Sequence, residues 1–280
     1  MPLTASRYGK ERVRVMRLTR AGDHHTPREL TLSVMLTGRF DAAWTEGDNR
    51  ACIATDSVKN IVNVTAARHL SLDKEAFVAA VAQVLLDTYR QVEAVTIEAE
   101  ETRWLRHRVD DVAHGHTFTR DGNGVGFVAL AADRAGSTLR SGLRGYTFMK
   151  TTQSGWADFV ADHYRTLPDT TDRIAATSMD ATWTWVTAPT AYEAANARIL
   201  ETLLTVFATT YSRSVQDSMY RMGEAALAAV RELADISFAM PNKHYVPIDL
   251  TPFGLDNSGA VFLPTDEPFG RIEATISRST

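Results

Sequence analysis

Five short segments of the sequence place polar side chains directly beside apolar stretches. They are Tyr8–Lys10, Gly47–Asn60, Thr170–Ile174, Ser214–Gln216 and Met240–His244. Between them they contain an arginine, which offers parallel N–H donors, and a glutamine, whose amide offers both a donor and an acceptor. They also contain a lysine and a histidine, two residue types whose side chains can accept and donate protons. Side chains of these types can hydrogen-bond a small polar ligand and move protons.

Each of these residues also has an ordinary structural explanation. Arg173 is close in sequence to Asp169 and Asp172, and a surface salt bridge with either one would account for it. Taken alone, Lys10 is typical of an exposed lysine at the start of a strand. His244 is typical of a core histidine whose hydrogen bonds are satisfied. The residue types by themselves therefore leave both interpretations open.

The remaining histidines and the single cysteine bear on metal binding. Asp110–His116 contains two histidines and two aspartates, and Asp23–His25 contains a pair of histidines. Neither group has a third ligand at a recognisable spacing, so we expect no catalytic metal. Cys52 is the only cysteine, which excludes an intramolecular disulfide and a cysteine metal cluster.

Strands are predicted where apolar and polar residues alternate, because successive side chains of a strand point to opposite faces. In the stretch that ends at Ile276, for example, Ile272, Ala274 and Ile276 alternate with charged and hydroxyl residues. The predicted strands lie at about residues 12–15, 30–37, 95–109, 117–132, 145–152, 174–187, 236–250 and 260–276.

Helices are predicted where apolar residues recur with helical spacing. They begin at about Ser57, Asp73, Ala191 and Val215. The second has Ser71 as its expected N-cap. Their apolar stripes include Phe77, Val81 and Leu85 in the second helix, Ile199, Leu203 and Phe207 in the third, and Met219, Met222 and Ala226 in the fourth.

The order of these elements is the same in both halves of the chain: two strands, two helices, two strands. We therefore expect two tandem ββααββ domains, at residues 1–135 and 136–280. Antiparallel strand pairs with helices on one face of the sheet define the α+β class. No stretch rich in proline, glycine or serine separates the halves, so they are expected to pack tightly.

Composition bounds the possible partners and compartment. The chain is 44% apolar and 23% charged over 280 residues, which is typical of a globular protein with a sizeable core. Its net charge of -4 argues against a nucleic-acid partner, so a small anionic ligand would need a local positive group. No apolar run is long enough for a membrane span. The ends lack a secretory signal and a peroxisomal serine-lysine-leucine ending, so we expect a cytoplasmic protein.

The polar segments, taken together, resemble urate oxidase (uricase), and the resemblance extends over nearly the whole chain. It is carried by five collinear stretches: LTGRFDAAWTEGDN, HTFTRDGN, GYTFMKTTQSGW, LPDTTDRIAATSMDATW and PNKHYVPIDLTPFGLDN. The resemblance implies the tunnelling fold, in which each chain has two ββααββ halves and four chains assemble around a central channel. It also implies oxidation of urate by O2 and water to 5-hydroxyisourate and hydrogen peroxide, in purine degradation and without a cofactor.

The resemblance assigns substrate-binding roles to residues of the second half. Urate is a flat, anionic heterocycle with donors and acceptors around its rim. Arg173 would bind a pair of rim acceptors, Gln216 a neighbouring edge, and the backbone of Val215 a further atom. Asn242 would hold oxygen or water over the ring.

A stacking phenylalanine of the family falls where this chain has Trp156. Tryptophan keeps an aromatic face for stacking but is bulkier. Phe159 is three residues further on and is the alternative. We favour Trp156 because TTQSGW preserves the spacing to Arg173.

The resemblance implies that Lys10 and Thr55 form a catalytic dyad, with His244 as a third proton-handling residue. A lysine in a low-dielectric pocket can become a neutral amine, which would take a proton from Thr55 while Thr55 takes one from urate. Asp56, beside Thr55, would contact the substrate edge or orient the backbone. The family shares its sites between subunits, so Lys10 and Thr55 are expected to face the other site residues of a neighbouring chain in a homotetramer.

Two other functions remain open at this point. One is a related enzyme that handles pterins or purines, such as a cyclohydrolase or aldolase, although these often use a set of metal-binding histidines. The other is a purine-binding protein that has lost catalysis. Lys10, Thr55 and His244 are all present and argue against it, whereas Trp156 favours it.

Overall fold

Strand β2 (His24–Gly38) shows how the alternation in the sequence produces a sheet. Leu30, Leu32, Val34 and Leu36 are completely buried, whereas the residues between them are partly exposed, as the pleat of a strand requires. β2 pairs in antiparallel fashion with β1 (Tyr8–Ala21) on one side and β3 (Val92–Thr102) on the other. The structure, a computed structural model, describes residues 1–70 and 73–278.

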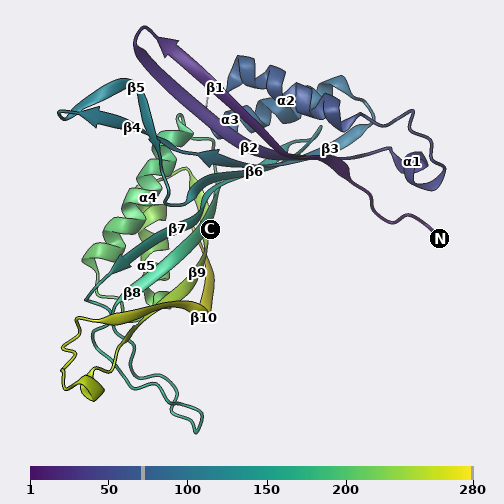
Figure 1. Cartoon of the computed structure of the whole chain (residues 1–280). Coiled ribbons are helices and arrows are strands. Elements are labelled where there is room, and N and C mark those ends of the chain that lie inside the picture. Colours follow the sequence, from purple (N-terminus) through teal and green to yellow (C-terminus); the bar gives the residue numbers. More distant parts are fainter. Residues whose placement is uncertain (71–72, 279–280) are drawn as a thin grey trace. The chain divides into compact units, whose positions relative to one another are not determined.

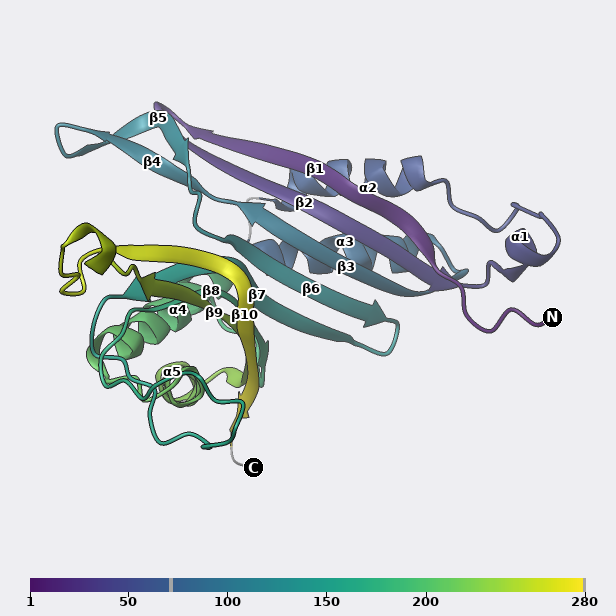
Figure 2. The same ribbon diagram turned by 60° about the horizontal axis from the view of Figure 1, so that its bottom comes forward.

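The first of two compact units contains residues 1–142 and 190–193. Its main strands follow the order β1-β2-β3-β6, with β6 at Val125–Asp133. Helices α2 (Thr55–His69) and α3 (Lys74–Thr88) lie together on one face of these strands (Figure 1, Figure 2). The predicted stripe of α3 is buried against the sheet at Phe77, Val81 and Leu85. A short helix, α1 (Asp41–Thr45), precedes α2.

The start of α3 differs slightly from the sequence prediction. Asp73 occupies the N-cap position, and its side chain makes no capping hydrogen bond. Ser71, the predicted N-cap, lies outside the described residues.

A hairpin interrupts two strands that the sequence predicted to be continuous. The predicted strands 95–109 and 117–132 were wrong in extent, because β3 ends at Thr102. β4 (Trp104–Val109) and β5 (Val112–Arg120) form a separate two-stranded sheet. The turn-forming sequence Asp121–Gly124 separates β5 from β6. Most residues of the hairpin are exposed, so burial on one face does not impose the alternation on which the prediction relied.

The second compact unit contains residues 143–189 and 194–280. Its strands follow the order β7-β8-β9-β10 and its two long helices pack on one face. Met179, Ala181 and Trp183 are buried on the helix side of β8, and Trp185 packs beside them. The elements are β7 (Ser137–Lys150), β8 (Ala175–Trp185), α4 (Tyr192–Thr209), α5 (Val215–Ala229), β9 (Leu233–Pro247), the short 3-10 helix η1 (Thr251–Phe253) and β10 (Phe262–Ser277).

Two successive ββααββ arrangements, one in each unit, confirm the predicted α+β class and tandem repeat. The domain boundary between residues 135 and 136 stays a prediction, and β7 contributes residues to both compact units. Among the described residues, no helix has the length and apolar character needed to cross a membrane.

Candidate active site

The core-facing row of side chains on β9 changes from apolar to polar near the end of the strand. Ile236, Phe238 and Met240 are buried in the core of the second unit. Asn242 and His244 continue this row, because alternate residues of a strand share a face. Both are partly buried. The end of β9 therefore presents an amide and an imidazole where the strand leaves the core.

The neighbouring strand β8 has its polar residues at the same place. Thr177 belongs to the row of Met179 and lies directly opposite Asn242 in the antiparallel pairing of β8 with β9. Arg173 precedes the first residue of β8 by two positions. The polar ends of the two rows thus meet at one end of the sheet.

A cavity lies at this end of the sheet, beneath the start of α5. Its lining includes Arg173, Thr177, Ser212, Val215 and Asn242. It has about 10 Å³ of room for the centre of a water-sized molecule, which is enough for one water and much too little for an aromatic ring. A ring-shaped ligand would therefore have to lie at the rim of this cavity.

Arg173 is held by its backbone, and the described residues leave the Nε of its guanidinium without a hydrogen-bond partner. The Arg173 N–H donates to the carbonyl of Ser154 at 2.8 Å. Asp169 forms an ion pair with Arg165 instead, and Asp172 accepts hydrogen bonds from the loop that follows β7. Within the described part of the chain, the salt bridge that would have explained Arg173 structurally is not formed. Its Nε is buried and has no hydrogen-bond partner there.

The electrostatics of Arg173 follow from this burial. Removal from water lowers the pKa of its guanidinium, and the nearby Tyr211 partly offsets the effect. A guanidinium stays protonated at neutral pH even so. The site therefore contains a positive charge that is poorly solvated and has donors to offer.

The first turn of α5 adds a second source of positive potential. Ser214 is the N-cap, and its hydroxyl accepts a hydrogen bond from the Asp217 N–H at 3.0 Å. Val215 and Gln216 are the first helical residues, whose N–H groups have no acceptor within a helix. Val215 lines the cavity, and Gln216 is exposed. An anion is favoured at such a helix end.

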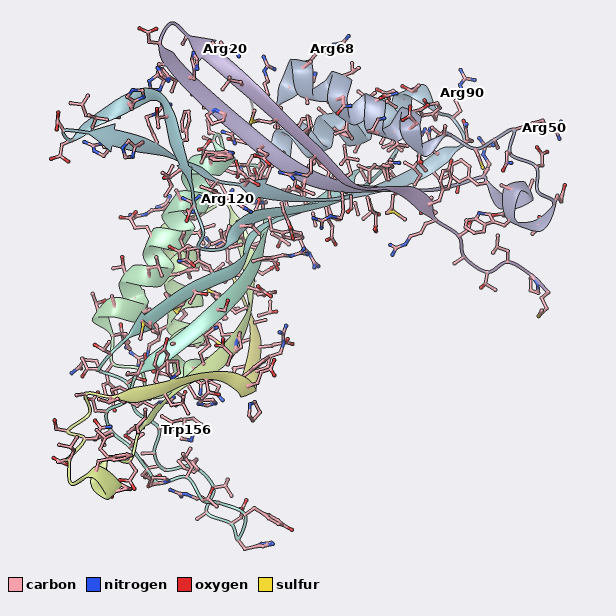
Figure 3. All side chains as sticks on the ribbon, viewed as in Figure 1. Arg20, Arg50, Arg68, Arg90, Arg120 and Trp156 are labelled. Atoms are coloured by element: carbon pink, nitrogen blue, oxygen red, sulfur yellow. The ribbon has the colours of Figure 1, made fainter. Side chains whose placement is uncertain are left out.

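Trp156 lies in the loop between β7 and β8 (Figure 3). Its backbone forms an antiparallel bridge with Thr170, with hydrogen bonds of 2.7 and 2.9 Å. Its ring stacks on Phe159, with 5.3 Å between centroids and 17° between planes. The guanidinium carbon of Arg165 lies 3.9 Å from the centre of the Phe159 ring. Trp156 is thus supported by Phe159, the residue that the sequence offered as its alternative.

Lys10, Thr55 and Asp56 lie in the first unit. Lys10 is near the start of β1 and Thr55 is the first residue of α2. Tyr8 connects these segments, because its hydroxyl accepts a hydrogen bond from the Ile53 N–H at 2.7 Å. This hydrogen bond holds the start of β1, which carries Lys10, beside the start of α2, which carries Thr55 and Asp56.

The Asp56 carboxylate is exposed and has local partners. Lys59 and Asn60 both donate hydrogen bonds to it. The Lys59 hydrogen bond is the main cause that lowers the pKa of Asp56, and the charge of Lys10 adds a smaller contribution. Lys59 and Asn60 thus hold the first turn of α2 around Asp56.

The predicted site residues accordingly fall into two groups. Arg173, Val215 and Asn242 line one cavity of the second unit. Gln216 follows Val215, His244 is on the row of Asn242, and Trp156 is on the loop that carries Arg173. The first unit contains the other three predicted residues. Among the residues described by the structure, no group of three or more metal-binding side chains is arranged to hold a metal ion.

The cavity also contains hydroxyl groups that the sequence analysis did not identify. They belong to Ser154, Thr177, Ser212 and Ser218, and Ser214, the first residue of one of the five polar segments, adds another. Ser218 donates to the Ser212 hydroxyl at 2.7 Å. One available signal was Thr177, a polar residue in the otherwise apolar row of β8. Serine residues on both sides of the predicted helix start were another.

The two ββααββ units define a tunnelling-fold protein, and the guanidinium of Arg173 lies in the cavity at the end of the second sheet. The uricase family model matches residues 6–129 and 139–273. The chain belongs to the uricase family.

Named relatives and a solved structure agree with this assignment. A uricase from Arthrobacter globiformis is 36% identical over 276 residues, which cover 99% of this chain and 90% of that protein. A uricase from Aspergillus flavus is 34% identical over 292 residues, covering 99% and 97%. The crystal structure of the Arthrobacter globiformis uricase matches with a TM-score of 0.93 at 35% identity, over 99% of this chain and 95% of that one.

Proposed function

We propose that this chain is a urate oxidase, which converts urate, O2 and water to 5-hydroxyisourate and hydrogen peroxide in purine degradation. O2 takes up two electrons from urate together with two protons and leaves as hydrogen peroxide. Water supplies the hydroxyl group of the product. The substrate itself is the reductant, so the reaction proceeds without a metal or flavin. Membership of the uricase family and the names of the relatives support this function.

The observation that carries the proposal is the partly buried guanidinium of Arg173 beside the first turn of α5, with an Nε that has no hydrogen-bond partner among the described residues. Urate is an anion at neutral pH, so a desolvated cation and a helix N-terminus both favour it. Arg173 binds two acceptors on the rim of urate, and the Gln216 amide binds the adjacent edge. The Val215 backbone makes a further contact. Trp156 stacks on the purine face.

Proton transfer is the task of the remaining residues. Lys10 accepts a proton from the Thr55 hydroxyl, which accepts one from urate. The electron-rich dianion then reacts with O2, which Asn242 holds over the ring. His244 passes protons between the site and the surrounding water. Asp56 contacts the substrate edge or orients the backbone beside Thr55.

The active form is a homotetramer in which each site is shared between subunits. Lys10, Thr55 and Asp56 of one chain face the second-unit residues of its neighbour. The cavity supports this arrangement, since it holds about one water and leaves the purine at its rim. A purine bound there needs a second wall, which another subunit supplies.

The test is a balanced assay of the purified protein. Urate loss, O2 consumption and hydrogen peroxide release are measured together, before and after treatment with a chelator and dialysis. We expect one O2 consumed and one peroxide released for each urate, at a rate that chelation leaves unchanged. Activity that disappears on chelation and returns with an added metal would refute the cofactor-free mechanism. The absence of any urate loss would refute the function itself.

A further inference from the structure

Thr177 is a buried hydroxyl residue in the apolar row of β8. It is only 3% exposed, and its row otherwise consists of apolar residues such as Met179 and Ala181. Its Oγ1 has no hydrogen-bond partner among the described residues. A buried hydroxyl without a hydrogen-bond partner lowers the stability of the folded protein. A valine of the same shape would avoid this loss, so the threonine hydroxyl is expected to have a function.

Two groups around the cavity are chemically complementary to this hydroxyl. The Nε–H of Arg173 is also buried and unpartnered, and it can only donate a hydrogen bond. Asn242 lies directly opposite Thr177 on β9, which places the two side chains on one face about 5 Å apart at Cβ. The amide oxygen of Asn242 can only accept. One hydroxyl can accept from the arginine and donate to the asparagine at the same time.

Three other hydroxyl groups of the cavity, those of Ser212, Ser214 and Ser218, already have hydrogen-bond partners. Ser218 donates to Ser212, and it also contacts the carbonyl of Ser214 at 3.0 Å. Ser214 accepts from the Asp217 N–H. Thr177 is therefore the hydroxyl whose unmet hydrogen bonds match those of Arg173.

We propose that Thr177 is a positioning residue that links Arg173 to Asn242. Its oxygen accepts a hydrogen bond from the Arg173 Nε, and its hydrogen is donated to the Asn242 amide oxygen. A side-chain rotation and a small closure of the cavity bring the three groups together. This fixes the guanidinium, whose two terminal nitrogens stay available to urate. It also turns the Asn242 NH2 group toward the reacting ring. The inference rests on the proposed function of Arg173 and Asn242.

The kinetic test compares Thr177→Val with Thr177→Ser. Valine keeps the shape of threonine and removes only the hydroxyl, whereas serine keeps the hydroxyl. We expect Thr177→Val to lower kcat/KM for urate by about tenfold or more, the effect of losing one or two hydrogen bonds. The KM should rise as Arg173 loses its support, and the kcat should fall as Asn242 loses its orientation. Thr177→Ser should recover most of the activity.

Thermal unfolding separates positioning from a structural role. Replacing a buried hydroxyl by a methyl group suits an apolar core, so the Tm of Thr177→Val should be unchanged or higher. Unchanged kinetics in Thr177→Val would overturn the proposal. The proposal would also be overturned if the Tm of Thr177→Val dropped so far that less folded protein explained the lost activity.

Crystal structures of the ligand-free wild type and of Thr177→Val provide a readout that does not depend on urate. The proposal predicts hydrogen bonds from Arg173 to Thr177 and from Thr177 to Asn242 in the wild type. In Thr177→Val the Asn242 amide should turn or occupy two orientations. Identical Arg173 and Asn242 positions in both structures would refute the linking role. If the wild type proves unable to oxidise urate, the proposed function fails and this comparison still decides the role of Thr177.

Discussion

Arg134 and Arg278 make equivalent hydrogen bonds in the two units. Each lies just after the last strand of its unit and donates to three backbone carbonyls spaced three residues apart. The acceptors of Arg134 are Leu86, Tyr89 and Val92, and those of Arg278 are Leu227, Val230 and Leu233. In both units these carbonyls run from the end of the second helix to the start of the next strand. The internal repeat thus extends from the order of the elements to an individual side-chain contact.

From these hydrogen bonds we predict that substitution of either arginine lowers the stability of the protein by a similar amount, independently of the other. Arg134→Ala and Arg278→Ala should each lower the free energy of unfolding by about 1–3 kcal/mol, because carbonyls at a helix end lose a charged donor. Urea unfolding of each variant measures the loss. Arg134→Lys and Arg278→Lys are the matched controls, and each should lose less. An unfolding midpoint that is insensitive to both alanine variants would show that these hydrogen bonds contribute nothing.

Glu29 predicts a pH dependence of stability in the first unit. Its carboxylate is buried and accepts hydrogen bonds from Arg14 at 2.7 Å and from the Trp104 indole at 3.0 Å. The Arg14 hydrogen bond is the main cause that lowers the pKa of Glu29 in the folded protein. The unfolded chain therefore binds a proton more readily. The stabilisation is present above the unfolded glutamate pKa and is lost as the pH falls through the lower folded value.

The variant that checks this is Glu29→Gln. At neutral pH it should be less stable than the wild type by on the order of 1 kcal/mol, a modest figure since Arg14 is largely exposed to solvent. The difference should shrink as the pH falls below the unfolded glutamate pKa and through the lower folded value, because the carboxylate is then progressively protonated. Urea unfolding at several pH values measures both quantities. A stability difference that stays constant down to pH 3 would exclude Glu29 as the titrating group.

If Trp156 stacks on urate, the KM for urate should depend on the size of the aromatic face at this position. Stacking of an aromatic side chain on a base contributes about 1–3 kcal/mol, so Trp156→Ala should raise the KM for urate roughly tenfold or more. Trp156→Phe keeps an aromatic face and should remain active. Steady-state kinetics of the two variants make the comparison. Phe159→Leu is a useful companion, because it removes the ring on which Trp156 stacks. An unchanged KM in Trp156→Ala would transfer the stacking role to another side chain.

The fold was largely predictable from the periodicity of apolar residues. The errors of that prediction have a physical cause. Strands such as β2 and helices such as α3 are amphipathic because one face is buried, and burial leaves a pattern in the sequence. The β4–β5 hairpin is exposed on most of its length, so its residues carry no such pattern. Its presence inside the predicted strands was therefore missed.

The site was only partly predictable, because it depends on contacts between distant segments. Periodicity predicted a strand at about residues 236–250, which contains Asn242 and His244. It gave no indication that Asp172 and Asp169 have other partners, which is what leaves Arg173 unpaired. Thr177 was also missed, because its proposed role depends on the strand register that places it opposite Asn242. The assignment of roles rested on the family resemblance rather than on residue patterns.

The shared site is the central claim, and complementation tests it most directly. Lys10→Met should be nearly inactive because it lacks the base, and Arg173→Ala should be nearly inactive because it lacks the substrate anchor. When the two variants are co-expressed with different tags, mixed assemblies can be purified on both tags. Some sites in these assemblies combine an intact Lys10 from one chain with an intact Arg173 from another. Urate oxidation by the doubly purified protein should therefore return to a substantial fraction of the wild-type rate per site. Mixed assemblies that remain as inactive as either variant alone would contradict a site shared between subunits.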